Sequence, residues 1–312
     1  MRIIKPKYWD KKNSLISFFL IPFSIFFQIL VFLKSKFTKE YIFSIPVICV
    51  GNIYVGGTGK TPLSIKIAKI LKKLNKKVAI IKKSYREHDD EFKLINSNKV
   101  KLFKNTSRVL AINEAIDSKF DCVIMDDGFQ DRSIKTNLNI ICFAERQLFG
   151  NGMTLPSGPL REPLTSIKKS QIVVINGKKN SEFENKIKNI SSNINIYYSY
   201  YLPTNLINFK DHKLLAFAGI GNPENFFSLL KENNLNVVKK MPFPDHYNYS
   251  INELNEIVNF SLKNNLKIIT TEKDFFRIKH FQIAQIKCLN VELKILNSEV
   301  WIIYFNQLSN NH

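Results

Sequence analysis

The stretch that decides the fold of this chain is Gly51-Asn52-Ile53-Tyr54-Val55-Gly56-Gly57-Thr58-Gly59-Lys60-Thr61. An apolar run, 45–50, leads into it, and an alternating apolar segment, 63–74, follows it. This pattern predicts a strand, a glycine-rich loop and a helix. Glycines let successive backbone N–H groups turn inward towards a phosphate chain, and the helix adds its positive N-terminal end. The stretch therefore predicts a nucleotide phosphate site.

The end of the loop matches the Walker A pattern. Lys60 can reach the β- and γ-phosphates of a nucleotide, and the Thr61 hydroxyl can ligate Mg²⁺. Tyr54 stands where the first glycine of the pattern usually lies. An ordinary glycine-rich turn is the alternative, but it leaves Lys60 and Thr61 unexplained. We expect ATP to be bound by Gly56, Gly57, Thr58, Gly59, Lys60 and Thr61.

A second apolar run, 120–125, ends in Asp126 and Asp127. Taken alone, the following Asp-Gly pair would indicate a simple turn. Behind a phosphate-loop strand it is typical of the Walker B position, where the carboxyl end of a neighbouring strand brings Asp126 to Mg²⁺. The two stretches together predict an α/β fold with a P-loop NTPase-like sheet.

Composition restricts the class of protein. The 312 residues are 45% hydrophobic, enough for a packed core, and carry a formal net charge of +20. Such a charge favours nucleic acid, anionic lipid or a phosphorylated substrate as partner, although abundant Lys can also be solvated surface. The cysteines are scattered without Cys-x-x-Cys spacing, so we expect reduced core residues and no disulfide framework or metal site.

The segment 15–33 is apolar and uncharged. Its length could cross a bilayer, but Pro22 would interrupt a helix and polar residues recur on one stripe. Basic residues flank it on both sides, without the asymmetry that orients a spanning helix. We expect a helix lying in the membrane interface, bound to anionic headgroups; a spanning helix and a buried core helix are the alternatives. The polar stripe comprises Ser17, Ser24, Gln28 and Ser35.

The remainder of the chain predicts two lobes. The segment 82–92 is polar and predicts a loop, and the Gly- and Pro-rich stretch 150–163 predicts a hinge between lobes. Strand and helix patterns then begin again at 171–176. We expect an N-terminal membrane-associated helix over 1–40, a P-loop core lobe over 41–165 and a second α/β lobe over 166–312.

Six motifs occur in one order along the chain. They are Val-Gly-Asn-Ile-Tyr-Val-Gly-Gly-Thr-Gly-Lys-Thr at 50–61, Asp-Asp-Gly-Phe-Gln at 126–130, Leu-Pro-Ser-Gly-Pro-Leu-Arg-Glu-Pro at 155–163, Phe-Ala-Gly-Ile-Gly-Asn-Pro at 217–223, Phe-Pro-Asp-His-Tyr at 243–247 and Thr-Glu-Lys-Asp at 271–274. Over most of its length the chain thereby resembles the tetraacyldisaccharide 4′-kinase family of lipid A synthesis. The resemblance implies two α/β/α lobes, ATP and Mg²⁺ as cofactors, and transfer of the γ-phosphate to the 4′-hydroxyl of an acylated glucosamine disaccharide 1-phosphate. It also implies a place at the cytoplasmic face of the inner membrane, in contact with membrane lipids.

The resemblance also implies roles for individual residues. Asp126 and Glu162 stand in metal positions, and Asp127 in an active-site position. Arg108 and Arg161 stand on the substrate side, although a structural salt bridge is an equal alternative for Arg161.

An Asp supported by a His is implied as the base for the acceptor hydroxyl. The His matches His246. The Asp matches Asp90 in the stretch Asp89-Asp90-Glu91-Phe92. Asp89 is the second choice, because both flanks of the family's Gly-Asp-Glu-Pro motif differ here. A carboxylate held by an imidazole can accept a proton as the sugar oxygen attacks.

Two further positions depart from the family pattern. Lys83 replaces an expected arginine, which keeps the charge but loses bidentate phosphate geometry. Asp131 replaces a histidine. These changes predict altered substrate contacts or a weaker enzyme.

Two other classes of protein remain as alternatives. A membrane-docking P-loop ATPase of the partitioning type would carry a signature lysine before the glycine pair, where this chain has Val55. A nucleic-acid-binding NTPase would cluster its basic residues with aromatic platforms, but the lysines here are dispersed and the N-terminal apolar segment would have no use. We therefore expect no nucleic-acid partner.

Overall fold

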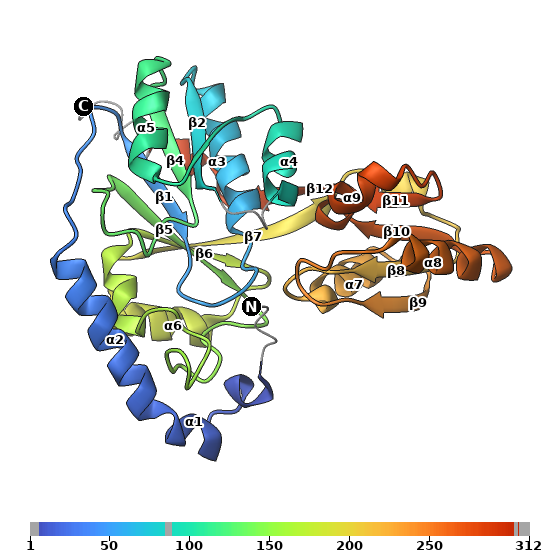
Figure 1. The fold of residues 1–312 in the computed structure, drawn as a ribbon, viewed down its shortest axis with the longest axis horizontal. Coiled ribbons are helices and arrows are strands. Elements are labelled where there is room, and N and C mark those ends of the chain that lie inside the picture. Colours follow the sequence, from blue (N-terminus) through green and yellow to red (C-terminus); the bar gives the residue numbers. More distant parts are fainter. Residues whose placement is uncertain (1–5, 85–88, 303–304, 306–312) are drawn as a thin grey trace. The chain divides into compact units, whose positions relative to one another are not determined.

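The computed structural model describes residues 6–84, 89–302 and 305. Its chain divides into two compact units. Of the described residues, the large unit comprises 6–84, 99–200, 295–302 and 305, and the small unit comprises 89–98 and 201–294. Each unit is an α/β structure with its own sheet (Figure 1).

Within the described residues, the large sheet has the strand order β12-β7-β6-β5-β1-β4-β2-β3. Neighbouring strands from β7 to β3 run parallel. The chain passes between the two units within β7 and within β12. The strands are β1 (Val47–Gly51), β2 (Val78–Lys83), β3 (Lys101–Asn105), β4 (Cys122–Asp126), β5 (Leu138–Ala144), β6 (Ile172–Asn176), β7 (Asn195–Pro203) and β12 (Val291–Ile295).

The helices of the large unit cover both faces of this sheet. Helix α3 packs over β1, β2 and β4, whereas the buried residues of α5 and α6 join the core on the other face. Alternate strand residues point to opposite faces, so the central strands read as continuous apolar runs. The helices are α1 (Leu15–Phe19), α2 (Ile21–Lys36), α3 (Lys60–Lys73), α5 (Arg108–Asp117) and α6 (Ser181–Ile190).

The small unit is also a three-layer structure. Its sheet has the order β11-β10-β8-β9 among the described residues, and all three pairings are parallel. The buried residues of α7 pack on one face and those of α8 on the other. Its elements are α4 (Asp89–Ser97), β8 (Leu214–Ala218), α7 (Pro223–Glu232), β9 (Val237–Pro242), α8 (Ile251–Lys263), β10 (Lys267–Thr271), α9 (Glu272–Ile278) and β11 (Ile286–Leu289).

The predicted fold of two α/β/α lobes is confirmed. The boundary between the units lies after residue 200, however, and not at 165/166. Residues 166–200 continue the large sheet through β6 and β7, because β6 pairs with β5 over five residues. The 150–163 loop thus lies inside the large unit and is not a hinge between lobes. The segment 82–92 is not one loop either, because β2 continues to Lys83 and α4 begins at Asp89.

Candidate active site

The phosphate loop follows β1, the strand at which the order of the large sheet reverses. The chain runs from β1 to β2 and β3 on one side and later to β5, β6 and β7 on the other. Ligands of open α/β sheets bind at such a point, beyond the carboxyl ends of the strands. The register pairs Val50 with Asp126, so the loop after β1 and the acidic end of β4 lie side by side.

The loop is shaped by its glycines and by the side chain of Asn52. Gly56 and Gly59 have φ of 118° and 91°, values that favour glycine. A Cβ added to Gly56 or Gly57 would meet nothing within 4 Å, so protein packing does not explain the missing side chains. The Asn52 amide donates to Gly56 O and to the Thr58 hydroxyl. An open, glycine-lined curl ahead of α3 fits a phosphate chain.

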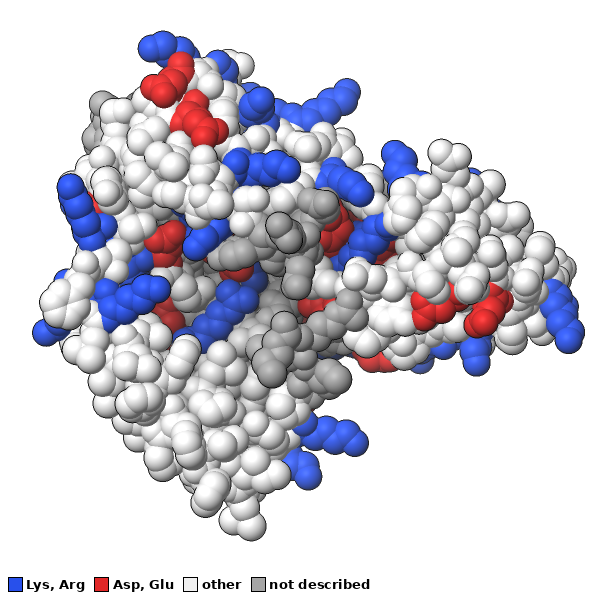
Figure 2. All heavy atoms as spheres, in the orientation of Figure 1, with Lys and Arg blue, Asp and Glu red and all other residues white. Residues whose placement is uncertain are grey.

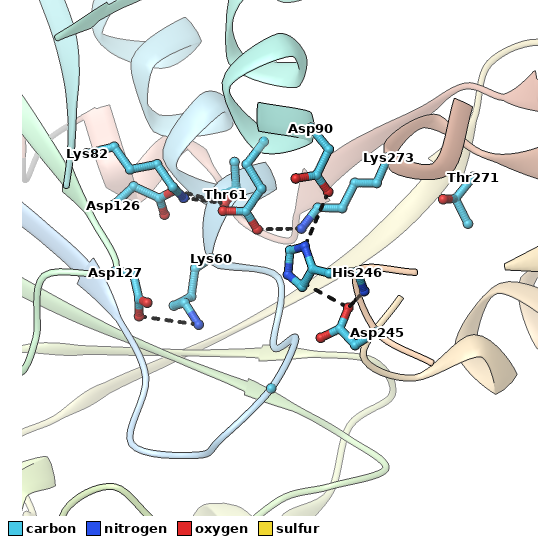
Figure 3. Close-up of polar contacts among 12 residues, drawn as sticks. Lys60, Thr61, Lys82, Asp90, Asp126, Asp127, Asp245, His246, Thr271 and Lys273 are labelled. Carbon is cyan, nitrogen blue, oxygen red and sulfur yellow. Dashed lines mark hydrogen bonds and ion pairs between the residues drawn. The ribbon is translucent and has the colours of Figure 1, made fainter. Parts of the chain in front are cut away.

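Asp126 is the buried carboxylate of this site. It has no exposed surface and accepts hydrogen bonds from the Thr61 hydroxyl at 2.8 Å and from the Ser64 hydroxyl at 3.1 Å. The Lys82 ammonium lies 2.5 Å from the same Asp126 Oδ2 that accepts from Thr61 (Figure 3). Hydroxyl and carboxylate oxygens are the donors that Mg²⁺ prefers, so Thr61 and Asp126 fit the predicted metal. Among the described residues, no group of three or more His, Cys, Asp or Glu side chains could hold a metal by itself.

Asp127 gathers cationic side chains. Its Oδ1 lies 3.4 Å from Lys60 Nζ and 3.1 Å from a terminal nitrogen of Arg161 (Figure 3 shows the first). Arg108 donates to the Asp127 carbonyl at 2.7 Å. Asp127 holds φ at 57°, a left-handed conformation that is uncommon outside glycine. The backbone therefore turns Asp127 towards Lys60, Arg108 and Arg161, and the positive charge of this group suits a phosphorylated ligand.

Asp131 positions one of these cations. Its carboxylate accepts from Arg108 at 2.9 Å and from the backbone and hydroxyl of Ser133. Burial raises the pKa of Asp131, but the hydrogen bonds from Ser133 and Arg108 outweigh it, and the net pKa lies below the ordinary value. The departure from the family's histidine thus creates an ion pair that orients Arg108.

Glu162 is engaged with other partners. Its buried carboxylate pairs with Arg132 at 2.5 Å and lies 3.7 Å from Lys169 Nζ. Burial lowers the pKa of Lys169, and the charge of Arg132 lowers it further. The predicted metal role of Glu162 stays a prediction, since these contacts tie it to two cations.

The small unit brings together Asp90 and His246. Asp90 lies on α4 and is buried, whereas His246 lies in the loop after β9, where its φ is 52°. Asp90 Oδ2 and His246 Nδ1 are 3.8 Å apart (Figure 3), beyond hydrogen-bond distance. Asp89 begins α4, but its side chain lies outside the described residues.

Arg277, on α9, joins these two residues. One terminal nitrogen donates to Asp90 Oδ2 at 2.6 Å and lies 3.3 Å from His246 Nδ1. A guanidinium can only donate, so His246 Nδ1 is on the accepting side of this contact. Burial lowers the pKa of Arg277, but the carboxylates of Asp90 and Asp274 outweigh it, and the net pKa lies above the ordinary value.

Asp274 holds Arg277 from behind. It is fully buried and accepts from Arg277 at 2.8 Å, from the Gly219 amide and from the hydroxyls of Thr271 and Tyr249. Burial raises the pKa of Asp274, and these partners oppose the rise. One terminal nitrogen of Arg277 is thus held by Asp274, and the other fixes the Asp90 carboxylate.

The N-terminal helices attach by their polar stripe. Ser24 bonds to the Ser157 hydroxyl and to Thr154 O, and Ser17 accepts from Asn151. The helix is interrupted at Leu20, two residues before Pro22.

The apolar side chains of these helices face outward. Phe19, Phe23 and Phe26 are 78%, 58% and 63% exposed, and Figure 2 shows a broad uncharged surface over α1 and α2 with basic side chains at its margins. Across the rest of this view, Lys and Arg are spread out and mixed with Asp and Glu. Among the described residues, no helix combines the length and hydropathy needed to cross a bilayer.

Three side chains of the candidate site are not indicated by the sequence motifs. Alternation along β2 brings Lys82 to Asp126, whereas the predicted Lys83 is the next residue and ends the strand. Ser64 lies one turn beyond Thr61 on α3, a spacing that could have identified it. Arg277 follows Asp274 by three residues on α9, so helical spacing from the Thr-Glu-Lys-Asp motif was the available signal.

Comparison with known proteins agrees with the motifs. The family model described as tetraacyldisaccharide-1-P 4′-kinase matches residues 16–307. Curated tetraacyldisaccharide 4′-kinases of Pelagibacter ubique and Rickettsia canadensis are 46% and 34% identical, each over 95% of this chain and 95% of the relative. A crystal structure of the "apo" form of LpxK from Aquifex aeolicus in complex with ATP has a TM-score of 0.73 at 24% identity, covering 94% of this chain and 99% of that one. The chain belongs to the tetraacyldisaccharide 4′-kinase family, the kinases of lipid A biosynthesis.

Proposed function

We propose that this chain transfers the γ-phosphate of ATP to the 4′-hydroxyl of an acylated glucosamine disaccharide 1-phosphate. The observation that carries the proposal is the glycine-lined curl after β1, whose following helix presents the Thr61 hydroxyl to the buried Asp126 carboxylate. The names of the relatives supply the acceptor, and the Aquifex aeolicus structure in complex with ATP supports the donor.

The residues of the large unit would bind the triphosphate. Gly56, Gly57, Thr58 and Gly59 supply backbone N–H groups, and Lys60 balances the charge of the terminal phosphates. Thr61 and Asp126 would hold Mg²⁺, which neutralises charge on the phosphoryl oxygens when bound. Arg108 and Arg161, now turned to Asp127, supply positive charge for the transferred group or for the substrate phosphate.

The residues of the small unit would receive the proton of the acceptor. Asp90 is the proposed base, because its carboxylate is buried and held in one orientation by Arg277. His246 supports it, with Arg277 as the link between the two. Phosphoryl transfer needs mainly positioning and charge neutralisation, and these buried ion pairs supply positioning.

The test is phosphorylation of the acylated disaccharide 1-phosphate in detergent by wild type and variants. Asp90→Ala and His246→Ala should each lower turnover by roughly 10²–10⁴, the range for loss of a general base, with little change in ATP binding. Thr61→Ala should instead impair use of Mg²⁺·ATP. Near wild-type turnover of Asp90→Ala would assign the base elsewhere, and absence of transfer by well-folded wild type would refute the activity.

We further propose that α1 and α2 lie in the interface of the inner membrane at its cytoplasmic face, beside the lipid acceptor. Their polar stripe is used by hydrogen bonds to the 150–163 loop, while their aromatic side chains are exposed between basic ends. An apolar face of this kind binds the headgroup boundary, and Lys34 and Lys36 favour anionic lipid.

Flotation with phosphatidylglycerol vesicles tests this attachment. Replacing Phe23, Phe26 and Leu30 by Ser should abolish co-flotation in high salt. The control Leu110→Ser changes a side chain of similar exposure (52%) on α5 and should leave co-flotation unchanged. Unchanged co-flotation of the triple variant would contradict the proposal.

A further inference from the structure

The predicted metal position already contains a cation that belongs to the chain. Lys82 Nζ lies 2.5 Å from Asp126 Oδ2 and 3.4 Å from Thr61 Oγ1. These are the two side chains expected to hold Mg²⁺. The Lys82 residue is 5% exposed, and in Figure 3 its side chain extends to the Asp126 carboxylate.

The sheet dictates this placement. Strands β2 and β4 run parallel with Ile81 paired to Met125, so the next residues lie at the same level: Lys82, the last but one of β2, and Asp126, the last of β4. Both side chains are buried, whereas Lys83, one residue on, is half-buried. The pair therefore follows from the strand register and not from a chance side-chain rotamer.

Electrostatics makes the pair consequential. A fully buried carboxylate without a compensating charge is strongly unfavourable, and the two hydroxyl donors of Thr61 and Ser64 carry no net charge. Lys82 therefore neutralises Asp126 when no metal is present. A divalent cation at the same oxygen would be repelled by the ammonium and would have to displace it. The four-carbon stem of lysine allows such a withdrawal.

We propose that Lys82 is a tethered counter-ion of Asp126 that competes with Mg²⁺, so that this kinase takes up the metal only together with the phosphates of ATP. The phosphate oxygens supply additional ligands for Mg²⁺. They also supply negative charge, which offsets the charge that the Lys82 ammonium neutralises on Asp126. This inference rests on the proposed nucleotide function of the loop and adds a determinant of its metal affinity.

Mn²⁺ binding, followed by electron paramagnetic resonance, tests the proposal without relying on catalysis. Wild type should bind Mn²⁺ weakly alone and more tightly with a non-hydrolysable ATP analogue. Lys82→Met should bind it at least about tenfold more tightly than wild type without nucleotide, because one positive charge about 4 Å away is removed. Lys82→Arg, which keeps the charge, should not gain affinity. The matched control is Lys73→Met, which removes an exposed lysine at the far end of α3.

Lys82→Ser provides a second, smaller variant in case the methionine is poorly accommodated, and Mn²⁺ should raise the melting temperature of either folded variant more than that of wild type. Wild-type affinity or weaker in both Lys82→Met and Lys82→Ser would overturn the role of Lys82. Absence of Mn²⁺ binding with the ATP analogue in wild type and variants alike would instead overturn the proposed nucleotide function.

Discussion

Removing the guanidinium of Arg277 is the perturbation whose outcome is most fully determined by the structure. Arg277→Met keeps the aliphatic stem of the residue but deletes the group that bonds Asp90 at 2.6 Å and Asp274 at 2.8 Å. Lys279→Met is the matched control, because it removes a positive charge from an exposed side chain two residues away.

The size of the effect follows from burial. The Asp90 and Asp274 side chains are 2% and 0% exposed, and deleting one partner of a buried pair costs about 3–5 kcal/mol. Asp274 keeps its bonds from Thr271, Tyr249 and the Gly219 amide. We therefore expect the lower end, about 3 kcal/mol in the free energy of unfolding at pH 7, against less than about 0.5 kcal/mol for Lys279→Met.

The pH dependence of this cost has a definite sign. Burial already raises the pKa of Asp274 above the ordinary 3.8, and Arg277 opposes the rise. Without Arg277 the pKa of Asp274 rises further, so the folded state binds more protons than the unfolded state. When the folded state raises a carboxyl pKa, the associated stability is fully present at pH values below the ordinary pKa. It is lost as the pH rises through the pKa of the folded state. Arg277→Met should therefore be less destabilising near pH 4 than at pH 7.

Urea unfolding of wild type and both variants at pH 4 and pH 7 measures these quantities. Arg277→Lys should recover part of the stability, because an ammonium supplies the charge without the fork that bonds two carboxylates. A cost of Arg277→Met equal to that of Lys279→Met, or the same at both pH values, would contradict the role of Arg277 in holding Asp90 and Asp274.

Three other substitutions have expected outcomes. Asp131→Asn should lower the free energy of unfolding by about 1–2 kcal/mol at pH 7 through the lost charge-assisted bond to Arg108. Because the pKa of Asp131 is lowered, the difference from wild type should persist above pH 3.8 and shrink as the pH falls below it. A pH-independent difference in urea unfolding would exclude the ion pair as its cause. Gly51→Ala should lower the melting temperature and cost about 1–3 kcal/mol, since its Cβ would come within 2.4 Å of Phe129 Cβ; an unchanged melting temperature would show that this contact is not tight. Ser24→Ala should cost about 1–2 kcal/mol in unfolding free energy, because its hydroxyl is buried and bonded to the loop beneath it; a neutral result would argue against the docking of α2.

Local patterns predicted the strands, loop and helix that carry the candidate site of the large unit. The glycine loop is confirmed between β1 and α3, and Asp126 ends a strand beside it, because both features depend on short stretches whose residues carry the pattern themselves. The family pattern has its basic residue at the second position and therefore favours Lys83 over Lys82. Only the register of β2 against β4 determines which of two adjacent lysines faces Asp126.

Long-range contacts explain the rest. Asp90 and Arg277 are 187 residues apart, and no local signal pairs them. The strands β6 and β7 have the same apolar character whichever sheet they join, so the sequence suggested a second lobe from 166 onwards although they extend the first sheet. The sequence shows a polar stripe along α2 but not its partner, which is the 150–163 loop; the hydrogen bonds to this loop leave the aromatic side chains exposed.

We expect this chain to phosphorylate the 4′-position of a lipid-borne disaccharide. The most direct measurement is analysis of the product formed from γ-labelled ATP and the acylated disaccharide 1-phosphate in detergent, with the phosphorylated carbon identified by phosphorus–proton NMR. Wild type should form a new phosphomonoester at the 4′-carbon, and Asp90→Ala should form much less of it. Label released only as inorganic phosphate, or attached at another position, would contradict it.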